Sequence, residues 1–438
     1  MKSFVLTRRF WPLFAAQTLG AFADNTLRMA TIVAVFAAAS LEGSSVFALP
    51  FGLGEYAGTL VSMAFTIPVF LFSVIAGQLA DQRPRHHLIK RLKAIELLLM
   101  IFASLCFAIG NGPLLVFALF LMGTQSAFFS PVRTSVMPQY FSSHELIKAN
   151  GYFNAALFVA LVTGLGLGGY YVNQEGGRLI ISTLLVTAAG LGALFALGVP
   201  NAPAPGLLRL NWNIPQVAWR QIRFAQGLKG IWYPMLGIAW FWAIGAAVLA
   251  NLPNYVRDSL GGGDTEISLL QALFAIGAGV GSIGAGLLGT KMKDSFTLAG
   301  IGVAGTVLGT LFIWLITAQN NPTETMSADG LFHLSSLPLL ITFILTAAAN
   351  GLFVVPLMAA LQARAPESDR AQIMGTSNMT NGAGATLGAF FIVPLREVGL
   401  SAMDVFLCMS GLQLALFIFM IKRRHAIRQA AAKMTISS

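Results

Sequence analysis

The chain has 438 residues, of which 56% are hydrophobic and 10% are charged, and its formal net charge is +10. A soluble domain does not need so large an apolar share, so the composition excludes a soluble globular protein and indicates an integral membrane protein. The apolar runs are continuous rather than alternating, which favours spanning helices over the strands of a barrel.

Apolar runs with the length of a membrane-spanning helix, about 20 residues, follow one another along the sequence. The predicted fold class is therefore an all-α membrane protein with twelve transmembrane helices in two six-helix halves. We expect these helices at about residues 10–39, 52–79, 93–110, 113–136, 149–172, 178–199, 230–256, 267–289, 296–318, 334–360, 371–395 and 402–421.

A longer polar segment, residues 200–229, divides the first six predicted helices from the last six. Its prolines end the preceding helix. Its second part is predicted to form an amphipathic surface helix, with Trp219, Ile222 and Phe224 in the membrane interface. The expected domains are an N-terminal half at 1–199, a cytoplasmic linker at 200–229, a C-terminal half at 230–425 and a cytoplasmic tail at 426–438.

Basic residues are distributed unevenly over the predicted loops. With the N-terminus in the cytoplasm, twenty-three lysines and arginines fall on the cytoplasmic side, and only Arg178, Arg257 and Arg396 fall on the other. The positive-inside rule then places both termini in the cytoplasm. This topology, together with contact with anionic lipid head groups, explains the positive charge, so we expect no nucleic-acid partner.

The two predicted halves share weak sequence echoes. Gly77 begins the loop after the second span, and Gly286 begins the loop after the eighth. In each half a polar loop leads from a proline-containing span into a helix with an asparagine, Asn154 or Asn378. The fifth and eleventh spans carry glycine pairs that permit close helix approach: Gly164 and Gly168, and Gly384 and Gly388. Matching halves around a cavity are typical of secondary transporters.

The first predicted span carries Asp24, Asn25 and Arg28 in an otherwise apolar run. A charge at the centre of a membrane helix costs about 2.5–3.5 kcal/mol on insertion scales. Asp24 and Arg28 are four residues apart, so they share one helix face and can form an ion pair. We interpret them as a functional site within the membrane; a buried pair that fixes helix packing is the alternative.

Several N-terminal motifs resemble a known transporter family. The loop GQLADQRPR resembles the signature between helices 2 and 3 of the major facilitator superfamily, with Gly77, Asp81 and Arg85 in matching places and Pro84 where the family has glycine. The runs FWPLFAAQTLGAFADNTLR, IKRLKAIELLLM and ELIKANGYFNAA resemble its lysophospholipid transporter branch, which includes flippases and the transporter domains of acyltransferase fusions. The resemblance covers about residues 10–170 and extends to the C-terminal half only by pattern.

The resemblance implies a conformational latch formed by Gly77, Asp81 and Arg85. In the superfamily this acid faces the start of helix 11, where the helix dipole is positive. The contact would hold the two halves together on the cytoplasmic side in the outward-facing state. A solvated loop acid is the alternative interpretation of Asp81.

Further polar residues in the first four spans are candidates for a site. Lys93 and Glu96 are three apart and are predicted to pair, with a structural and a functional role left open. Gln17 and Gln125 lie in spans that line the cavity in this superfamily, so each is a candidate for binding a polar head group or for interhelical hydrogen bonding. Arg133 either snorkels to the interface or binds phosphate at the family's matching positive position.

The predicted function is alternating-access transport of lysophospholipid across or into the cytoplasmic (inner) membrane, with a separate acyltransferase as a candidate partner. The alternatives are proton-coupled efflux of amphiphilic small molecules through Asp24, and a non-transporting scaffold or receptor. The sequence contains no phosphate loop, zinc spacing or nucleophile elbow. We therefore expect neither an enzyme nor a cofactor or metal site, and we expect a monomer.

Overall fold

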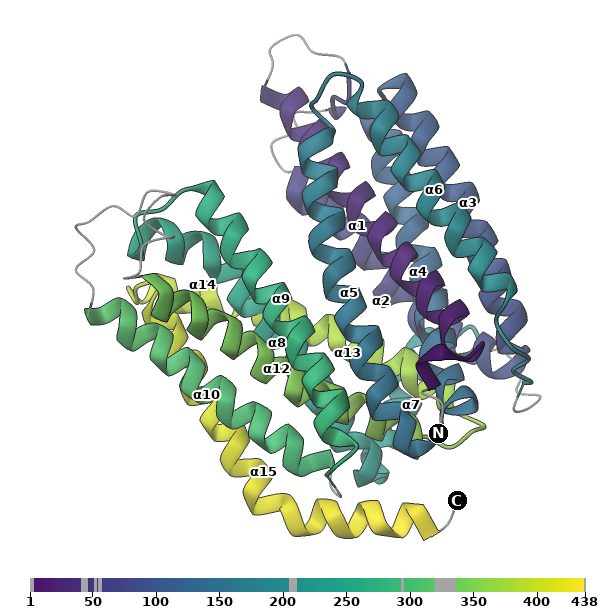
Figure 1. The fold of residues 1–438 in the computed structure, drawn as a ribbon, viewed down its shortest axis with the longest axis vertical. Coiled ribbons are helices and arrows are strands. Elements are labelled where there is room, and N and C mark those ends of the chain that lie inside the picture. The colour runs from purple at the N-terminus through teal and green to yellow at the C-terminus, as the bar shows by residue number, and fades with distance from the viewer. Residues whose placement is uncertain are drawn as a thin grey trace. The chain divides into compact units, whose positions relative to one another are not determined.

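The computed structural model describes residues 4–40, 46–50, 53, 57–204, 211–292, 295–319 and 336–436, and every regular element in these ranges is a helix (Figure 1). The long helices are α1 (Trp11–Ser40), α2 (Ala57–Gln82), α3 (Arg85–Ile109), α4 (Gly112–Tyr140), α5 (Ser143–Tyr171), α6 (Gly177–Leu197), α8 (Lys229–Asn254), α9 (Asp264–Gly289), α10 (Ser295–Gln319), α12 (Leu337–Arg364), α13 (Arg370–Phe390) and α15 (Asp404–Ile436). Shorter ones are η1 (Phe4–Leu6), α7 (Ile214–Gly227), η3 (Tyr255–Ser259) and α14 (Ile392–Glu397). The prediction of an all-helical chain is confirmed.

Within these described ranges, eleven helices are long and apolar enough to cross a membrane. The helix at the remaining predicted span is α13, whose hydropathy is lowered by polar residues such as Gln372, Ser377 and Asn378. α13 ends at Phe390, and the last part of the predicted span forms the separate short helix α14. The hydropathy of α13 is lower than that of the other spans because amide and hydroxyl side chains that bond to neighbouring helices stand in place of apolar side chains.

The amphipathic helix predicted within the linker is α7. Val217 and Ala218 of α7 are buried and pack with Val74 of α2, and Gln221 one turn later is also buried. On the opposite face Trp219 is exposed, with the Arg223 guanidinium stacked over its ring at 5.3 Å from the ring centroid. Phe224 is exposed as well, whereas Ile222 is only half-buried.

The chain divides into two compact units. Unit 1 comprises residues 1–142, 159–223 and 365–379, and unit 2 comprises residues 143–158, 224–364 and 380–438. The unit boundaries fall inside α5, α7 and α13, so each of these helices contributes to both units.

Close helix approaches repeat between the two units. In unit 1, a Cβ at Gly164 or Gly168 of α5 would lie 2.7 or 2.6 Å from a backbone oxygen of α1. In unit 2, Gly384 and Gly388 of α13 face the backbone of α8 in the same way, at Ala239 and Ala243. Both glycine pairs therefore form the close helix contacts that their spacing predicted, because only glycine allows these backbones to approach so closely.

Each unit has its own apolar core. In unit 1, α3 packs against α4 and α6, α1 packs against α6, and Leu27, Phe107 and Leu119 are fully buried between them. In unit 2, α12 packs against α8, α9 and α10. An aromatic cluster there brings the Tyr255 ring edge-on to Phe406, with ring centroids 4.9 Å apart. Polar side chains in either unit therefore stand out against a continuous apolar background.

Candidate functional site

One face of α1 carries the polar residues of the first span. Gln17, Gly20, Asp24 and Arg28 follow one another at intervals of three or four residues, so they lie on the same side of the helix. α3 and α4 supply the partners of the first three positions, all within unit 1. The face thus runs along about 16 Å of the helix axis, at 1.5 Å per residue.

Asp24 takes its hydrogen bond from α4 rather than from α1. The Ser126 hydroxyl donates to Asp24 Oδ2 over 3.0 Å, whereas Asp24 Oδ1 is buried and accepts no hydrogen bond. Asp24 also interacts electrostatically with Glu96 and Lys93 of α3. The Asp24 carboxylate therefore has one oxygen that accepts a hydrogen bond and one that does not.

The ion pair that helix spacing allows between Asp24 and Arg28 is not formed among the described residues of this structure. Arg28 Nη2 instead donates to Asn25 Oδ1 over 2.9 Å, and the Asn25 amide donates to the Ala21 carbonyl over 2.7 Å. The reason is that Ser126 draws the Asp24 carboxylate towards α4. Asn25, three residues before Arg28, then lies closest to the guanidinium.

Lys93, Glu96 and Gln125 form a buried polar group between α3 and α4. Lys93 Nζ donates to Glu96 Oε2 over 2.7 Å, and Gln125 Nε2 donates to the same oxygen over 3.0 Å. Lys93 also lies 4.4 Å from the centroid of the Phe129 ring. The group meets α1 at Gly20, where a Cβ would lie 2.8 Å from Glu96 Oε1. The structure therefore brings together the pair that the spacing predicted and places it against α1.

Arg133 of α4 reaches the same face of α1. Its Nη1 donates to Gln17 Oε1 over 2.5 Å, so the side chain is held by α1 rather than extended to a membrane surface. Within the described residues, neither Arg133 nor Arg28 donates to a carboxylate. Two guanidinium groups, one from α1 and one from α4, thus donate hydrogen bonds to neutral amides at this face.

The sequence did not point to Ser126 or Gly20, although both residues determine the geometry of the polar face of α1. Ser126 is the residue that orients Asp24, and Gly20 leaves the space that Lys93 Nζ and the Glu96 carboxylate fill. The run Thr124 to Ser126 interrupts an apolar stretch of α4 and could have indicated a polar helix interface. Gly20 gave no comparable signal, because glycine is common in membrane helices.

A second polar cluster lies where α2 meets the first turn of α13, within unit 1. Asp81 Oδ1 accepts from Arg85 Nη2 over 2.7 Å and from the Ala371 amide over 3.0 Å, and Asp81 Oδ2 accepts from the Gln372 amide over 3.0 Å. Asp81 and Arg85 are both fully buried. The structure therefore brings Asp81 to the start of the helix that its motif pointed to, where two backbone amides need an acceptor.

Close packing makes the Asp81 contact possible. Gly77, one turn before Asp81, lies so near to α13 that a Cβ there would be 2.6 Å from the Ala371 carbonyl oxygen. Gly375 of α13 in turn faces the carbonyl of Ser73. Asn378 of α13 donates to Ser130 of α4 over 2.8 Å. All three predicted latch residues, Gly77, Asp81 and Arg85, thus lie in one contact between α2, α3 and α13.

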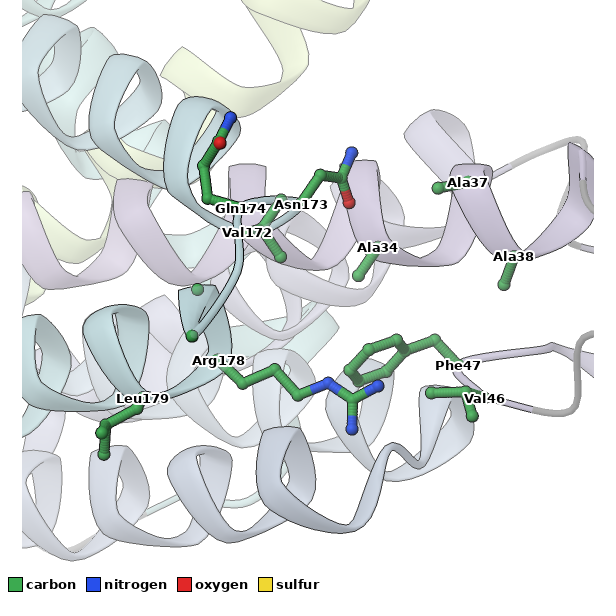
Figure 2. Close-up of a pocket in the computed structure, with 12 residues that line it drawn as sticks. Ala34, Ala37, Ala38, Val46, Phe47, Val172, Asn173, Gln174, Arg178 and Leu179 are labelled. Atoms are coloured by element: carbon green, nitrogen blue, oxygen red, sulfur yellow. The ribbon is translucent and has the colours of Figure 1, made fainter.

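A pocket of about 530 Å³ lies in unit 1 beyond Arg28, at the end of α1 (Figure 2). Ala34 and Ala38 form one wall, and the α5–α6 turn forms another. Figure 2 shows the Arg178 side chain extending to the Phe47 ring, whose centroid is 4.8 Å from the guanidinium carbon. None of the predicted site residues lines this pocket, so it is separate from the polar face of α1.

The sequence matches the protein-family model described as Major Facilitator Superfamily over residues 19–389, and again over residues 236–428. Two similar proteins are each named Lysophospholipid transporter LplT. The one from Pectobacterium carotovorum subsp. carotovorum (strain PC1) is 26% identical over 375 residues, covering 83% of this chain and 80% of the relative. The one from Escherichia coli O1:K1 / APEC is 26% identical over 366 residues, covering 81% of this chain and 80% of the relative.

Solved transporter structures share the fold. FucP, a Major Facilitator Superfamily transporter solved in the outward conformation, has a TM-score of 0.70 at 12% identity and covers 96% of this chain and 99% of its own. A bacterial homologue of the iron transporter ferroportin has a TM-score of 0.66 at 17% identity, with 94% and 99% covered. At such identities the likeness extends to the fold alone, and it confirms the predicted fold class.

Proposed function

Because the chain belongs to the Major Facilitator Superfamily, we propose that it is a secondary transporter that moves lysophospholipid across or into the cytoplasmic membrane. The substrate class comes from the names of the relatives, which match four fifths of this chain at about 26% identity. The transport mechanism is alternating access, in which two six-helix halves rock about a site near the membrane midplane.

The observation that carries the proposal is the pair of arginines at the polar face of α1, Arg28 of α1 itself and Arg133 of α4. Arg28 and Arg133 are each hydrogen-bonded to an amide and lie in predominantly apolar helices. A guanidinium in such surroundings favours an anion, and its two-pronged geometry suits a phosphate. The phosphate of a lysophospholipid supplies that anion, and the single acyl chain can remain against apolar helix surfaces.

The cluster around Asp81 supports a gating role at one end of the transporter. Asp81 accepts from the first two amides of α13 as well as from Arg85, so breaking the contact leaves several buried polar groups without partners. We propose that the contact forms when the cytoplasmic side is closed and breaks when that side opens. Gly77 is the residue that lets the two helices approach closely enough.

The membrane orientation is a further part of this proposal. The excess of basic residues in alternate loops favours cytoplasmic N- and C-termini and places Asp81 near the cytoplasmic surface. A lysophospholipid delivered to that surface is a substrate for reacylation. A separate acyltransferase is therefore the partner that we propose, acting on the released product.

A ligand-shift melting experiment tests the substrate proposal on purified protein. Lysophosphatidylethanolamine and lysophosphatidylglycerol should raise the melting temperature, and Arg28→Ala should weaken their binding roughly 10- to 100-fold, the loss of one hydrogen bond to a charged group. Arg28→Lys should retain part of the affinity, because lysine keeps the charge but not the planar fork. Arg220→Ala, an exposed arginine on α7, is the matched control.

Two outcomes would contradict the proposal. One is a melting shift with lysolipids that is the same in the wild type and in both Arg28→Ala and Arg133→Ala. The other is no shift with any lysolipid, together with a shift produced by a cationic amphiphile, which would favour efflux of amphiphilic small molecules.

A further inference from the structure

The pocket at the end of α1 has an apolar wall and a cationic wall. Ala34 and Ala38 of α1 form the apolar wall, whereas Phe47 and Arg178, the second residue of α6, form the cationic one (Figure 2). Its volume of about 530 Å³ is within the range of small-molecule sites. All of its lining residues belong to unit 1, so the pocket is a feature of that unit alone.

Arg178 forms no ion pair among the described residues. Its guanidinium carbon lies 4.8 Å from the centroid of the Phe47 ring, and it does not pair with Glu175 of the same turn. In unit 2, by contrast, Arg396 donates to Asp258 over 2.5 Å. Arg178 also lies in the first turn of α6, where the helix dipole disfavours a cation and where there is no acidic residue. An anion bound here would therefore neutralise positive charge.

The backbone around Phe47 fixes the position of the Arg178 guanidinium. Phe47 has a φ of 62°, a left-handed conformation that is uncommon for a bulky residue. Its amide donates to the Gly110 carbonyl over 2.7 Å, and its ring lies edge-on to Phe107 with centroids 5.8 Å apart. A Cβ at Gly110 would lie 3.6 Å from Arg178 Nη1. Strained conformations of this kind cluster at ligand sites, where their surroundings hold them in place.

We propose that this pocket binds the phosphate of a phospholipid head group, with Arg178 as the residue that contacts the phosphate. A ring stacked on one face of a guanidinium leaves the N–H groups at its edge free for paired hydrogen bonds, which match the geometry of a phosphate. Val46 and Leu179, two exposed apolar side chains, line the same pocket. They offer an acyl chain an apolar surface, so the pocket suits an amphiphile better than free phosphate.

The role of this pocket in transport rests on the proposed function. The charge bias of the loops favours a position of Arg178 at the outer membrane surface. Ala34 follows Arg28 by six residues, which is about 9 Å along α1 at 1.5 Å per residue. The head group of a lysophospholipid from the outer leaflet would therefore bind in this pocket first and at Arg28 next.

Thiol labelling of the purified protein in detergent tests the site. Ala38→Cys and Ala37→Cys place reporters in the pocket wall, and Ala39→Cys, at an exposed position outside the pocket, is the matched control. Cys408→Ala removes the accessible native thiol, whereas Cys106 is buried. Lysophosphatidylglycerol should slow the reaction of both reporters with a small methanethiosulfonate and should leave the control unchanged.

Substitution of Arg178 shows whether the protection depends on the guanidinium. Arg178→Ala should raise the lysophosphatidylglycerol concentration needed for protection roughly 10- to 100-fold, the loss of one hydrogen bond to a charged group. Arg178→Lys should retain part of the protection, because lysine keeps the charge. Arg220→Ala, at an exposed position of α7, should retain all of it. Arg178 is exposed, so the variants should fold, which their melting temperatures will check.

Four results would overturn the proposal. Lysophosphatidylglycerol fails to slow labelling of either reporter, or Arg178→Ala leaves the protection unchanged. Monoacylglycerol protects equally well, which would show an apolar cavity without a phosphate site, or inorganic phosphate does, which would show a site for the free ion. Protection should persist in Arg28→Ala, so a protein that binds lipid in this pocket but transports none would contradict the proposed function and not this site.

Discussion

Two helix crossings, one in each unit, share the same close glycine packing but differ at the position four residues after one of the glycines, which is Asp81 in unit 1 and Thr290 in unit 2. In unit 1, Gly375 of α13 lies against Ser73 of α2, and in unit 2, Gly151 of α5 lies against Ser282 of α9. An asparagine three residues after each glycine donates to a serine over 2.8 Å, Asn378 to Ser130 of a third helix, α4, and Asn154 to Ser282 of α9. The small-residue contact is therefore a repeated feature of the two halves.

Within the part of the chain that the structure describes, Thr290 does not repeat the acidic contact of Asp81. Asp81 follows Gly77 by four residues, and the residue four after Gly286 is Thr290, whose hydroxyl donates to the Leu287 carbonyl of its own helix. The first amides of α13 are thus bonded to a buried carboxylate, and Thr290 makes no such bond to α5. The comparison teaches that close packing is common to both crossings, whereas among the described residues the carboxylate bonded to the first amides of the facing helix is found at Asp81.

The largest expected effect comes from removing this charge. Asp81→Ala leaves Arg85 buried without a partner and should destabilise the protein by about 3–5 kcal/mol. Thr290→Ala at the corresponding position should change stability by no more than about 0.5 kcal/mol. Thermal unfolding of the two variants in detergent measures the difference. Equal effects would mean that the two crossings do not differ in the way described.

A smaller difference is expected from adding a methyl group to each crossing. At Gly77 a Cβ would be 2.6 Å from a backbone oxygen, whereas at Gly286 it would be 3.2 Å from the Lys148 Cα. Gly77→Ala should therefore cost about 1–3 kcal/mol through overpacking, and Gly286→Ala should cost less. Melting temperatures and transport rates of the two variants, measured side by side, would sharpen the comparison. A larger loss of stability for Gly286→Ala than for Gly77→Ala would contradict the comparison.

The smallest effects should be symmetrical. Asn378→Ala and Asn154→Ala each remove one interhelical hydrogen bond, which is worth about 0.6 kcal/mol on average in a membrane protein. The two variants should therefore lose similar stability. A double-mutant cycle of Asn154 with Ser282 isolates the bond in unit 2, and one of Asn378 with Ser130 isolates the bond in unit 1. Coupling energies that differ several-fold would contradict the repeat.

Local sequence patterns predicted contacts within one helix and close helix approaches, and the family resemblance predicted one contact between distant helices. The pairing of Lys93 with Glu96 follows from their spacing, and the approach of Asp81 to the start of α13 follows from the motif around Gly77. The repeated glycine pairs likewise predicted close helix contacts. The helix pair and the glycine contacts follow from a few consecutive residues, whereas the Asp81 contact was implied by the resemblance to the superfamily.

Contacts that depend on the register between helices could not be predicted in this way. Spacing on α1 predicted that Asp24 would pair with Arg28, but Ser126 of α4 competes for the carboxylate and the pair is not formed. Whether Ser126 lies opposite Asp24 depends on the axial offset between α4 and α1. Sequence periodicity sets the face of a helix but not that axial offset.

The central claim is that this chain transports lysophospholipid, and flux into proteoliposomes tests it most directly. Vesicles that contain the wild type should translocate labelled lysophosphatidylethanolamine faster than empty vesicles, and Arg28→Ala should reduce this rate while Arg220→Ala does not. No translocation of any lysolipid, in vesicles that do take up a cationic dye when a proton gradient is imposed, would contradict the account.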